Sequence, residues 1–584
     1  MKILLTTLNS KFIHTNLAIR YLKAFVQDIK KVDIKEYTIN NSIDFILKDI
    51  HKGDYDLVLF STYIWNVDDT VKICENLKKI KPNIKLALGG PEVTYDSKSA
   101  MEKYKFIDYI LYGEGELVFK DLIMHLEGDL KIEETEGIVY RKDDEIIVNK
   151  EKPLLENLDD IPSPYENLDP KEYENRIVYY ETSRGCPFNC QYCLSSTLKG
   201  LRYFSIDRVK KDLKKLIDAR VSQIKFIDRT FNANKKFAKE IMLFLMENDN
   251  NYTTYHFEVT AHLLDDDMLE FLSNCKEGLF QFEIGVQTTN QQALDEVGRR
   301  DDFERLSYVV KKIASFRNIH QHLDLIAGLP YENYSSFENS FNDVFNLGIE
   351  HLQLGFLKMI KGTGVRDRAL LHGYKYKDYA PYEVLYNNYI TYEEILRLKD
   401  IEEILERYYN SKNFILSMRY IIFNYYKESP FKFFEDFAVY FDENRYFDTG
   451  QAKNQLYKIL LDFYTYKIGE NTELFNDILK YDYISLGKTS NLPDFFNKVD
   501  LEDFKNRCHM FLQDEENILK YASKFKDKTA KQIIKHVHFE VFSFDIIKLK
   551  QDITLDIKNT LNTLMFVYDD LNCQFKSDKL LMNH

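Results

Sequence analysis

Apolar segments of strand length alternate with amphipathic helical segments over most of the first 360 residues, and this alternation limits the possible folds most strongly. In the first series, residues 17–29 carry Leu17, Tyr21, Phe25 and Ile29 at helical spacing. The strand candidates of this series are residues 1–8, 32–39, 55–63, 84–89 and 107–112. Repeated strand–helix units predict a doubly wound parallel sheet, in which a ligand binds beyond the carboxyl ends of the strands.

A second series of strand and helix patterns begins near residue 176. Its strand candidates are residues 177–182, 223–228, 255–260, 279–286, 320–327 and 351–357. Six such units predict a partial (β/α)6 barrel whose reactive face lies at the carboxyl ends of its strands. Beyond about residue 360 the strand pattern fades, and a stripe through Leu398, Ile401 and Leu405 indicates a mostly α-helical C-terminal domain.

The two series are separated by a hairpin pattern at residues 137–148 and by a segment containing Pro153, Pro162 and Pro164. Proline fixes the backbone and removes a hydrogen-bond donor, so this segment is typical of a linker. The predicted boundaries are therefore 1–135 for the first domain, 136–171 for the hairpin and linker, 172–400 for the barrel, and 401–584 for the helical accessory domain.

Composition narrows the classes of partner. The formal charge of −14 argues against general electrostatic binding of nucleic acid and favours a small-molecule substrate. No run approaches the ~20 apolar residues of a membrane helix, and the first residues lack the pattern of a signal peptide. We therefore expect a cytoplasmic protein. Seven cysteines, three of them within eight residues, favour metal chemistry over disulfides.

Those three cysteines form a C-x3-C-x2-C loop, Cys186, Cys190 and Cys193, directly after a predicted strand. Three thiolates can bind three irons of a [4Fe–4S] cluster and leave the fourth iron open to a chelating ligand. Structural zinc needs a fourth ligand, and the nearest candidate, Cys275, lies in a distant connector. The spacing therefore favours a [4Fe–4S] cluster, with zinc as the alternative.

The loop Arg-Gly-Cys-Pro-Phe-Asn-Cys-Gln-Tyr-Cys resembles the cluster motif of the radical S-adenosylmethionine (SAM) family, including the aromatic Tyr192. Further motifs of that family follow in order at residues 226–231, 284–287 and 323–330. The resemblance implies that a reduced cluster cleaves SAM to a 5′-deoxyadenosyl radical, which abstracts hydrogen from a substrate. It also implies an electron donor such as flavodoxin or ferredoxin.

Resemblance to the branch containing the oxygen-independent coproporphyrinogen oxidases implies a set of SAM-binding residues. These are Tyr192, Glu258, Gln287, Arg299 and Asp324. Carboxylates and amides accept hydrogen bonds from ribose hydroxyls, and a guanidinium pairs with the methionine carboxylate. Arg300 adjoins Arg299, so either arginine fits that role, and Glu258 and Asp324 also fit as caps of strand ends.

A flavodoxin-like domain ahead of such a barrel resembles the cobalamin-binding radical SAM enzymes. The implied cobalamin contacts are Ser61, Thr62, Gly89, Gly90 and Gly113. Glycine lets the backbone approach a bulky ligand, although Gly-Gly-Pro also fits a simple tight turn. The Asp-x-His-x-x-Gly motif of histidine-ligated cobalamin domains is absent around His14. We therefore expect base-off binding without a histidine ligand.

Together these resemblances imply a cobalamin-dependent radical SAM enzyme that methylates an unactivated carbon. Relatives with the same two domains also catalyse rearrangement, cyclisation or oxidation, and these reactions are the alternatives. A non-catalytic cobalamin or SAM sensor is the alternative from another class. Methylthiotransferases share a similar barrel, but their N-terminal domain carries three cluster cysteines, whereas residues 1–135 contain only Cys74.

Overall fold

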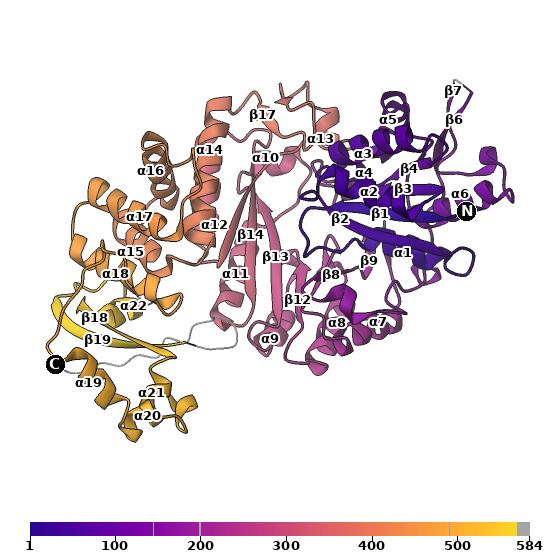
Figure 1. Ribbon diagram of the computed structural model, residues 1–584. Coiled ribbons are helices and arrows are strands. Elements are labelled where there is room, and N and C mark those ends of the chain that lie inside the picture. The colour runs from indigo at the N-terminus through magenta and orange to yellow at the C-terminus, as the bar shows by residue number, and fades with distance from the viewer. Residues whose placement is uncertain (144, 198–199, 490, 569–584) are drawn as a thin grey trace. The chain divides into compact units, whose positions relative to one another are not determined.

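The computed structural model describes residues 1–143, 145–197, 200–489 and 491–568 (Figure 1). Contacts divide the chain into two compact units, Met1–Ile395 and Leu396–His584. Of the described helices, none is long and apolar enough to cross a membrane.

The first unit begins with a seven-stranded sheet in the order β2-β1-β3-β4-β5-β6-β7. Its strands are β1 (Ile3–Asn9), β2 (Val32–Thr38), β3 (Leu57–Ser61), β4 (Lys85–Gly89), β5 (Tyr109–Leu111), β6 (Ile138–Lys142) and β7 (Glu145–Val148). The first five strands are parallel, and β6 and β7 extend the sheet as an antiparallel hairpin. This order confirms the predicted flavodoxin-like sheet.

Helices cover both faces of this sheet because its strands are apolar on both sides. The helices are α1 (Leu17–Val26), α2 (Ile43–Gly53), α3 (Val67–Ile80), α4 (Pro91–Thr94), α5 (Ser97–Lys103) and α6 (Gly115–Glu127). On β1, Ile3 and Leu5 join the core beneath α1 and α6, whereas Leu4 and Leu8 join the core beneath α2 and α3. A strand with two apolar faces is typical of a parallel sheet buried between helix layers.

The second sheet is the predicted partial barrel, with six parallel strands in the order β15-β14-β13-β12-β11-β8. The strands are β8 (Ile177–Tyr180), β11 (Gln223–Phe226), β12 (Thr254–Glu258), β13 (Phe280–Gln287), β14 (His320–Ala327) and β15 (His351–Phe356). The accompanying helices are α7 (Ile206–Asp218), α8 (Lys235–Glu247), α9 (Asp266–Ser273), α10 (Gln291–Glu296), α11 (Phe303–Phe316) and α12 (Tyr334–Phe345).

Burial alternates along the barrel strands. On β13, Phe282 and Ile284 are buried, whereas Glu283 and Gln287 on the other face are partly exposed. One face therefore packs in the core, and the other carries polar side chains toward the carboxyl ends of the strands.

Short hairpins that the sequence pattern did not predict flank the barrel. They are β9 (Ser183–Gly185) with β10 (Leu201–Tyr203), and β16 (Lys375–Tyr376) with β17 (Val384–Tyr386). Gly185 adopts φ +102°, and a Cβ there would lie 2.1 Å from the carbonyl oxygen of Gly200. Only glycine fits the position that leads into Cys186.

The second unit is mostly helical, as predicted, but it also contains an antiparallel pair, β18 (Val537–Phe544) and β19 (Asn559–Val567). Its helices are α15 (Ile415–Tyr425), α16 (Pro430–Glu443), α17 (Lys453–Lys467), α18 (Thr472–Ser485), α19 (Phe504–Phe511), α20 (Glu515–Tyr521), α21 (Ala530–Ile533) and α22 (Ile546–Gln551). The helix α14 (Tyr392–Ile404) runs across the division between the two units. Aromatic side chains such as Phe437 and Phe463 fill the core of this second unit.

Candidate cofactor site

The cysteine loop follows β9, close to the end of β8, and polar groups lie beside its sulfurs. The Sγ of Cys193 accepts a hydrogen bond from the backbone N–H of Ser195 at 3.4 Å. The Sγ of Cys186 lies 3.7 Å from Oγ1 of Thr230. The hydroxyl of Thr230 donates to the carbonyl of Arg229 at 2.7 Å, so it faces Cys186 with its oxygen as an acceptor.

Cys190 is the most buried of the three cysteines, and Arg299 lies against it. Burial raises the pKa of its thiol, while the guanidinium of Arg299, with Nη1 at 4.0 Å from Sγ, opposes that rise. The same Nη1 donates to the hydroxyl of Tyr192 at 3.3 Å. Arg300 is exposed, so the geometry selects Arg299 rather than its neighbour as the arginine at the loop.

The three thiols do not converge on a single position at which they could bind one metal ion. Among the described residues, no group of three His, Cys, Asp or Glu side chains is arranged to hold a metal ion. Ligation of a [4Fe–4S] cluster by Cys186, Cys190 and Cys193 therefore stays a prediction, which rests on the spacing of the three cysteines in one loop.

Glu258, Gln287 and Asp324 lie on three adjacent strands, β12, β13 and β14, toward their carboxyl ends. Oε1 of Gln287 and Oδ1 of Asp324 are buried and have no hydrogen-bond partner among the described residues. Unpaired buried acceptors are costly, so the pair fits a ligand that brings hydroxyl donors, as ribose does.

The charge state of these carboxyls follows from their burial. Burial, with the nearby carboxylates of Glu283 and Glu258, raises the pKa of Asp324 to about 8. Burial also raises the pKa of Glu258, against the opposing charge of Arg229. Glu283 is the exception, because His256 and Lys225 outweigh burial and lower its pKa to about 2. At neutral pH, Asp324 is therefore mainly protonated and can donate a hydrogen bond as well as accept one.

Four of the five predicted cobalamin residues meet where β3 and β4 end. Both the N–H and the hydroxyl of Thr62 donate to the carbonyl of Gly89, each at 2.7 Å. Gly90 has φ +107°, and a Cβ there would lie 2.5 Å from the carbonyl oxygen of Thr62. The hydroxyl of Thr62 therefore fixes the Gly-Gly turn, while Ser61 lies beside it at the end of β3.

Gly113, the fifth predicted residue, follows β5 with φ +81°, and a Cβ there would meet no described heavy atom within 4 Å. The two glutamates after it were not predicted as site residues. Glu116 binds Nη2 of Arg184 at 2.6 Å, and Glu114 lies 3.5 Å from Nη1. Arg184 precedes Cys186 by two residues, so these glutamates link the end of β5 to the cysteine loop. The sequence signal was the acidic pair in Gly-Glu-Gly-Glu.

His14 lies at a junction between the first sheet and the barrel. Its Nδ1 is 2.7 Å from the hydroxyl of Tyr179 on β8, and the N–H of Ile177 donates to the carbonyl of Ile13 at 2.7 Å. Burial, with Lys11 and Lys225, lowers the pKa of His14. Nδ1 of the imidazole thus has a protein partner in this structure, and the expectation that His14 is not a cobalt ligand stays a prediction.

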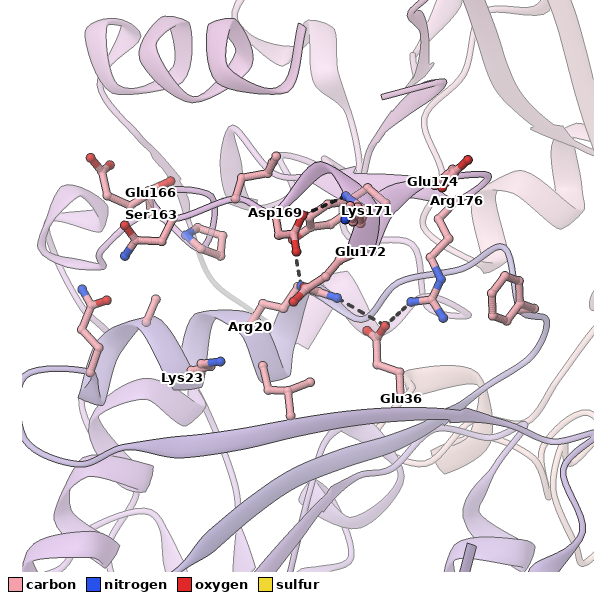
Figure 2. A pocket seen from close by; sticks show the side chains of 18 residues that line it. Arg20, Lys23, Glu36, Ser163, Glu166, Asp169, Lys171, Glu172, Glu174 and Arg176 are labelled. Carbon is pink, nitrogen blue, oxygen red and sulfur yellow. Dashed lines mark hydrogen bonds and ion pairs between the residues drawn. The ribbon is translucent and has the colours of Figure 1, made fainter. Parts of the chain in front are cut away.

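A separate cavity of about 500 Å³ lies between α1, β2 and the linker (Figure 2). Glu36 binds Arg20 at 3.3 Å and Arg176 at 2.6 Å, and Arg20 also binds Glu172 at 3.1 Å. The lining of this cavity includes none of the predicted cofactor residues. The cavity therefore presents paired charges and does not enlarge the candidate site.

Comparisons with known families agree with this arrangement. Residues 180–368 match the radical SAM superfamily, and residues 3–123 match the B12 binding domain. The chain is therefore a radical SAM enzyme with an N-terminal cobalamin-binding domain, and its cofactors are a [4Fe–4S] cluster, SAM and cobalamin. Residues 371–566 match a protein of unknown function (DUF4080). Within the superfamily, the chain is thus a B12-binding radical SAM protein with a C-terminal DUF4080 region.

Relatives with curated names are distant. An uncharacterized methyltransferase of Pyrococcus horikoshii is 26% identical over 414 residues, covering 68% of this chain and 87% of that protein. The cobalamin-dependent radical SAM methyltransferase TokK of Streptomyces tokunonensis is 24% identical over 324 residues, covering 50% of this chain and 45% of TokK. The solved structure of the cobalamin-dependent SAM radical enzyme OxsB with aqua-cobalamin has a TM-score of 0.60 at 14% identity. The match covers 82% of this chain and 79% of the OxsB chain. That likeness shows the fold.

We expect Gly90→Ala to abolish retention of hydroxocobalamin after gel filtration. A left-handed alanine costs about 1–3 kcal/mol, and the added Cβ also collides with backbone at Thr62, so the turn must move. Gly128→Ala is the matched control, because Gly128 has φ +92° but no described heavy atom near its Cβ position. Equal corrin retention by Gly90→Ala and wild type would contradict the assignment of this turn.

Proposed function

We propose that this enzyme transfers a methyl group to an unactivated carbon of a small-molecule substrate. The observation that carries the proposal is the direct link within one compact unit between the B12-binding domain and the cysteine loop, through Glu116 and Arg184. The methyltransferase names of the Pyrococcus relative and of TokK support it.

In this proposal Cys186, Cys190 and Cys193 hold the cluster, and the turn formed by Thr62, Gly89 and Gly90 faces the corrin. When bound, cobalamin supplies a transferable methyl group, and the cluster with SAM supplies a carbon radical. The chain's own residues orient and protect these groups.

Three residues near the loop orient SAM in this proposal. The guanidinium of Arg299, which donates to Asp301 at 2.9 Å, is the proposed partner of the methionine carboxylate. The unpaired oxygens of Gln287 and Asp324 are the proposed acceptors for the ribose hydroxyls. Because these acceptors are buried, each hydrogen bond forms away from competing water.

The proposal also covers the class of substrate, the electron donor, the cellular compartment and the domain boundaries. The net charge of −14 supports a small molecule rather than nucleic acid as substrate. A flavodoxin or ferredoxin is the proposed electron donor. All six described cysteines are free, which supports a reducing compartment such as the cytoplasm. We propose the boundaries 1–135, 136–171, 172–400 and 401–584 for the domains.

The test is anaerobic turnover of the reconstituted protein with reductant, hydroxocobalamin and methyl-labelled SAM, using fractionated cell metabolites as the substrate source. We expect S-adenosylhomocysteine and 5′-deoxyadenosine in comparable amounts, and a product that has gained one labelled methyl group. 5′-Deoxyadenosine without any methylated product would favour rearrangement, cyclisation or oxidation. Cofactor binding without SAM cleavage in any fraction would favour a sensor.

A further inference from the structure

The short segment from Lys361 to Val365, just after β15, contacts both candidate cofactor loops. At its start, Nζ of Lys361 lies 3.0 Å from Oε1 of Glu92 and donates to the carbonyl of Glu92 at 3.3 Å. Glu92 belongs to α4, two residues after Gly90, and its side chain is 1% exposed. Lys361 thus reaches the helix that begins at the Gly-Gly turn.

At its other end, the segment contacts the cysteine loop at Gln191. The N–H of Val365 donates to the carbonyl of Gln191 at 2.9 Å. Gly364, where α13 (Gly364–Asp367) begins, packs so closely that a Cβ there would lie 1.9 Å from Oε1 of Gln191. Gln191 is the residue between Cys190 and Tyr192, so this contact acts on the middle of the cluster motif.

The middle of the segment makes a third contact, which joins the two ends. Gly362 has φ +83°, and its Cβ position lies 2.4 Å from ring carbons of Tyr95, so only glycine fits against this ring. The hydroxyl of Tyr95 in turn lies 2.6 Å from Oγ1 of Thr197, at the end of the cysteine loop. Tyr95 directly follows α4.

The charge at Glu92 explains why Lys361 is needed there. A buried carboxylate is strongly unfavourable unless a cation and hydrogen bonds compensate it. Lys361 supplies the cation, and the hydroxyl of Tyr382 also donates to Glu92. Both contacts are made to Oε1, and Oε2 of Glu92 has no hydrogen-bond partner among the described residues, so the buried carboxylate depends on Lys361 and Tyr382.

We propose that residues 361–365 form a positioning strap, which sets the place of the corrin-facing turn relative to the cysteine loop, and that Lys361 is its key positioning residue. This inference rests on the proposed binding of both cofactors. Among the described residues, the polar contacts of the strap given above reach Glu92 and Gln191, so it acts through these two residues. Loss of the Lys361 contact should leave each cofactor bound but broaden the distribution of distances between them.

The experiment uses reconstituted full-length protein carrying both cofactors. The dipolar interaction between the reduced cluster and cob(II)alamin is measured by pulsed electron paramagnetic resonance in wild type, Lys361→Ala and Glu92→Gln. We expect unchanged iron and corrin content in both variants, with a broader distribution of interaction strengths than in wild type. Glu92→Gln covers the case in which Lys361→Ala fails to fold, because a neutral amide leaves no buried carboxylate without a cation, and Lys361 keeps Asp96 at 3.7 Å.

Two controls separate positioning from general stability. Lys358→Ala makes the same change at an exposed lysine three residues earlier and should match wild type. Gly128→Ala lowers stability elsewhere and should also leave the distribution unchanged. Distributions identical to wild type in both Lys361→Ala and Glu92→Gln would overturn the strap. Wild-type protein that binds no cluster or no corrin would instead defeat the proposed function.

Discussion

Simultaneous replacement of Cys186, Cys190 and Cys193 by alanine should remove iron and sulfide from the reconstituted protein. Loss is expected to be complete, because three thiolates are the only protein ligands that the motif provides to the cluster. Iron and sulfide per chain, with the visible absorption of the cluster, measure the effect. Iron content equal to wild type in the triple variant would refute the assignment.

Single alanine replacements of the other cysteines are the matched controls. Burial raises the pKa of Cys275 to about 12 and that of Cys508 to about 11, and it raises the pKa of Cys74 still further. Such thiols stay protonated at neutral pH and are poor metal ligands. Each control should keep full iron content. Cys573, also expected to be dispensable, lies outside the described residues.

The strands of both sheets were predictable because apolar periodicity is a local property of sequence. All six barrel strands were located to within about two residues, a normal error for such boundaries. The pair β18 and β19 was missed because α22 lies between its strands, so no tight turn marks a hairpin. The connection between the two strands is long and contains a helix, so the sequence gives no hairpin pattern.

The site was predictable in its residue types but not in its contacts. Thr62 was predicted as a cobalamin contact, which stays a prediction, whereas the hydrogen bond from its hydroxyl to the carbonyl of Gly89 was not predicted, since a backbone carbonyl one strand away is invisible in a linear motif. Arg184 and Glu116 are 68 residues apart, and no periodicity relates them. Lys361 and Glu92 are 269 apart. Ion pairs between distant segments depend on the tertiary fold, which local patterns do not specify.

Arg184→Met should lower the free energy of unfolding of the cofactor-free protein by about 3–5 kcal/mol, because it leaves buried carboxylates without their cation. Arg184 is 13% exposed and binds Glu181 at 2.8 Å as well as Glu116 at 2.6 Å. Chemical unfolding can be followed through Trp65, the single tryptophan, which lies between β3 and α3. Arg445→Met, at an 84% exposed position, should change stability by no more than about 0.5 kcal/mol.

The loss in Arg184→Met should also grow with pH. Burial raises the pKa of Glu181 to about 7 although Arg184 opposes the rise, so removing Arg184 raises that pKa further. When a carboxyl has a higher pKa in the folded state than in the unfolded state, the protein loses stability as the pH rises from the unfolded-state pKa toward the folded-state pKa. The gap between wild type and variant should therefore be wider at about pH 8 than at about pH 5. Adding Glu116→Gln should recover part of the loss, because a neutral amide needs no guanidinium, and a gap that is the same at both pH values would contradict this electrostatic account.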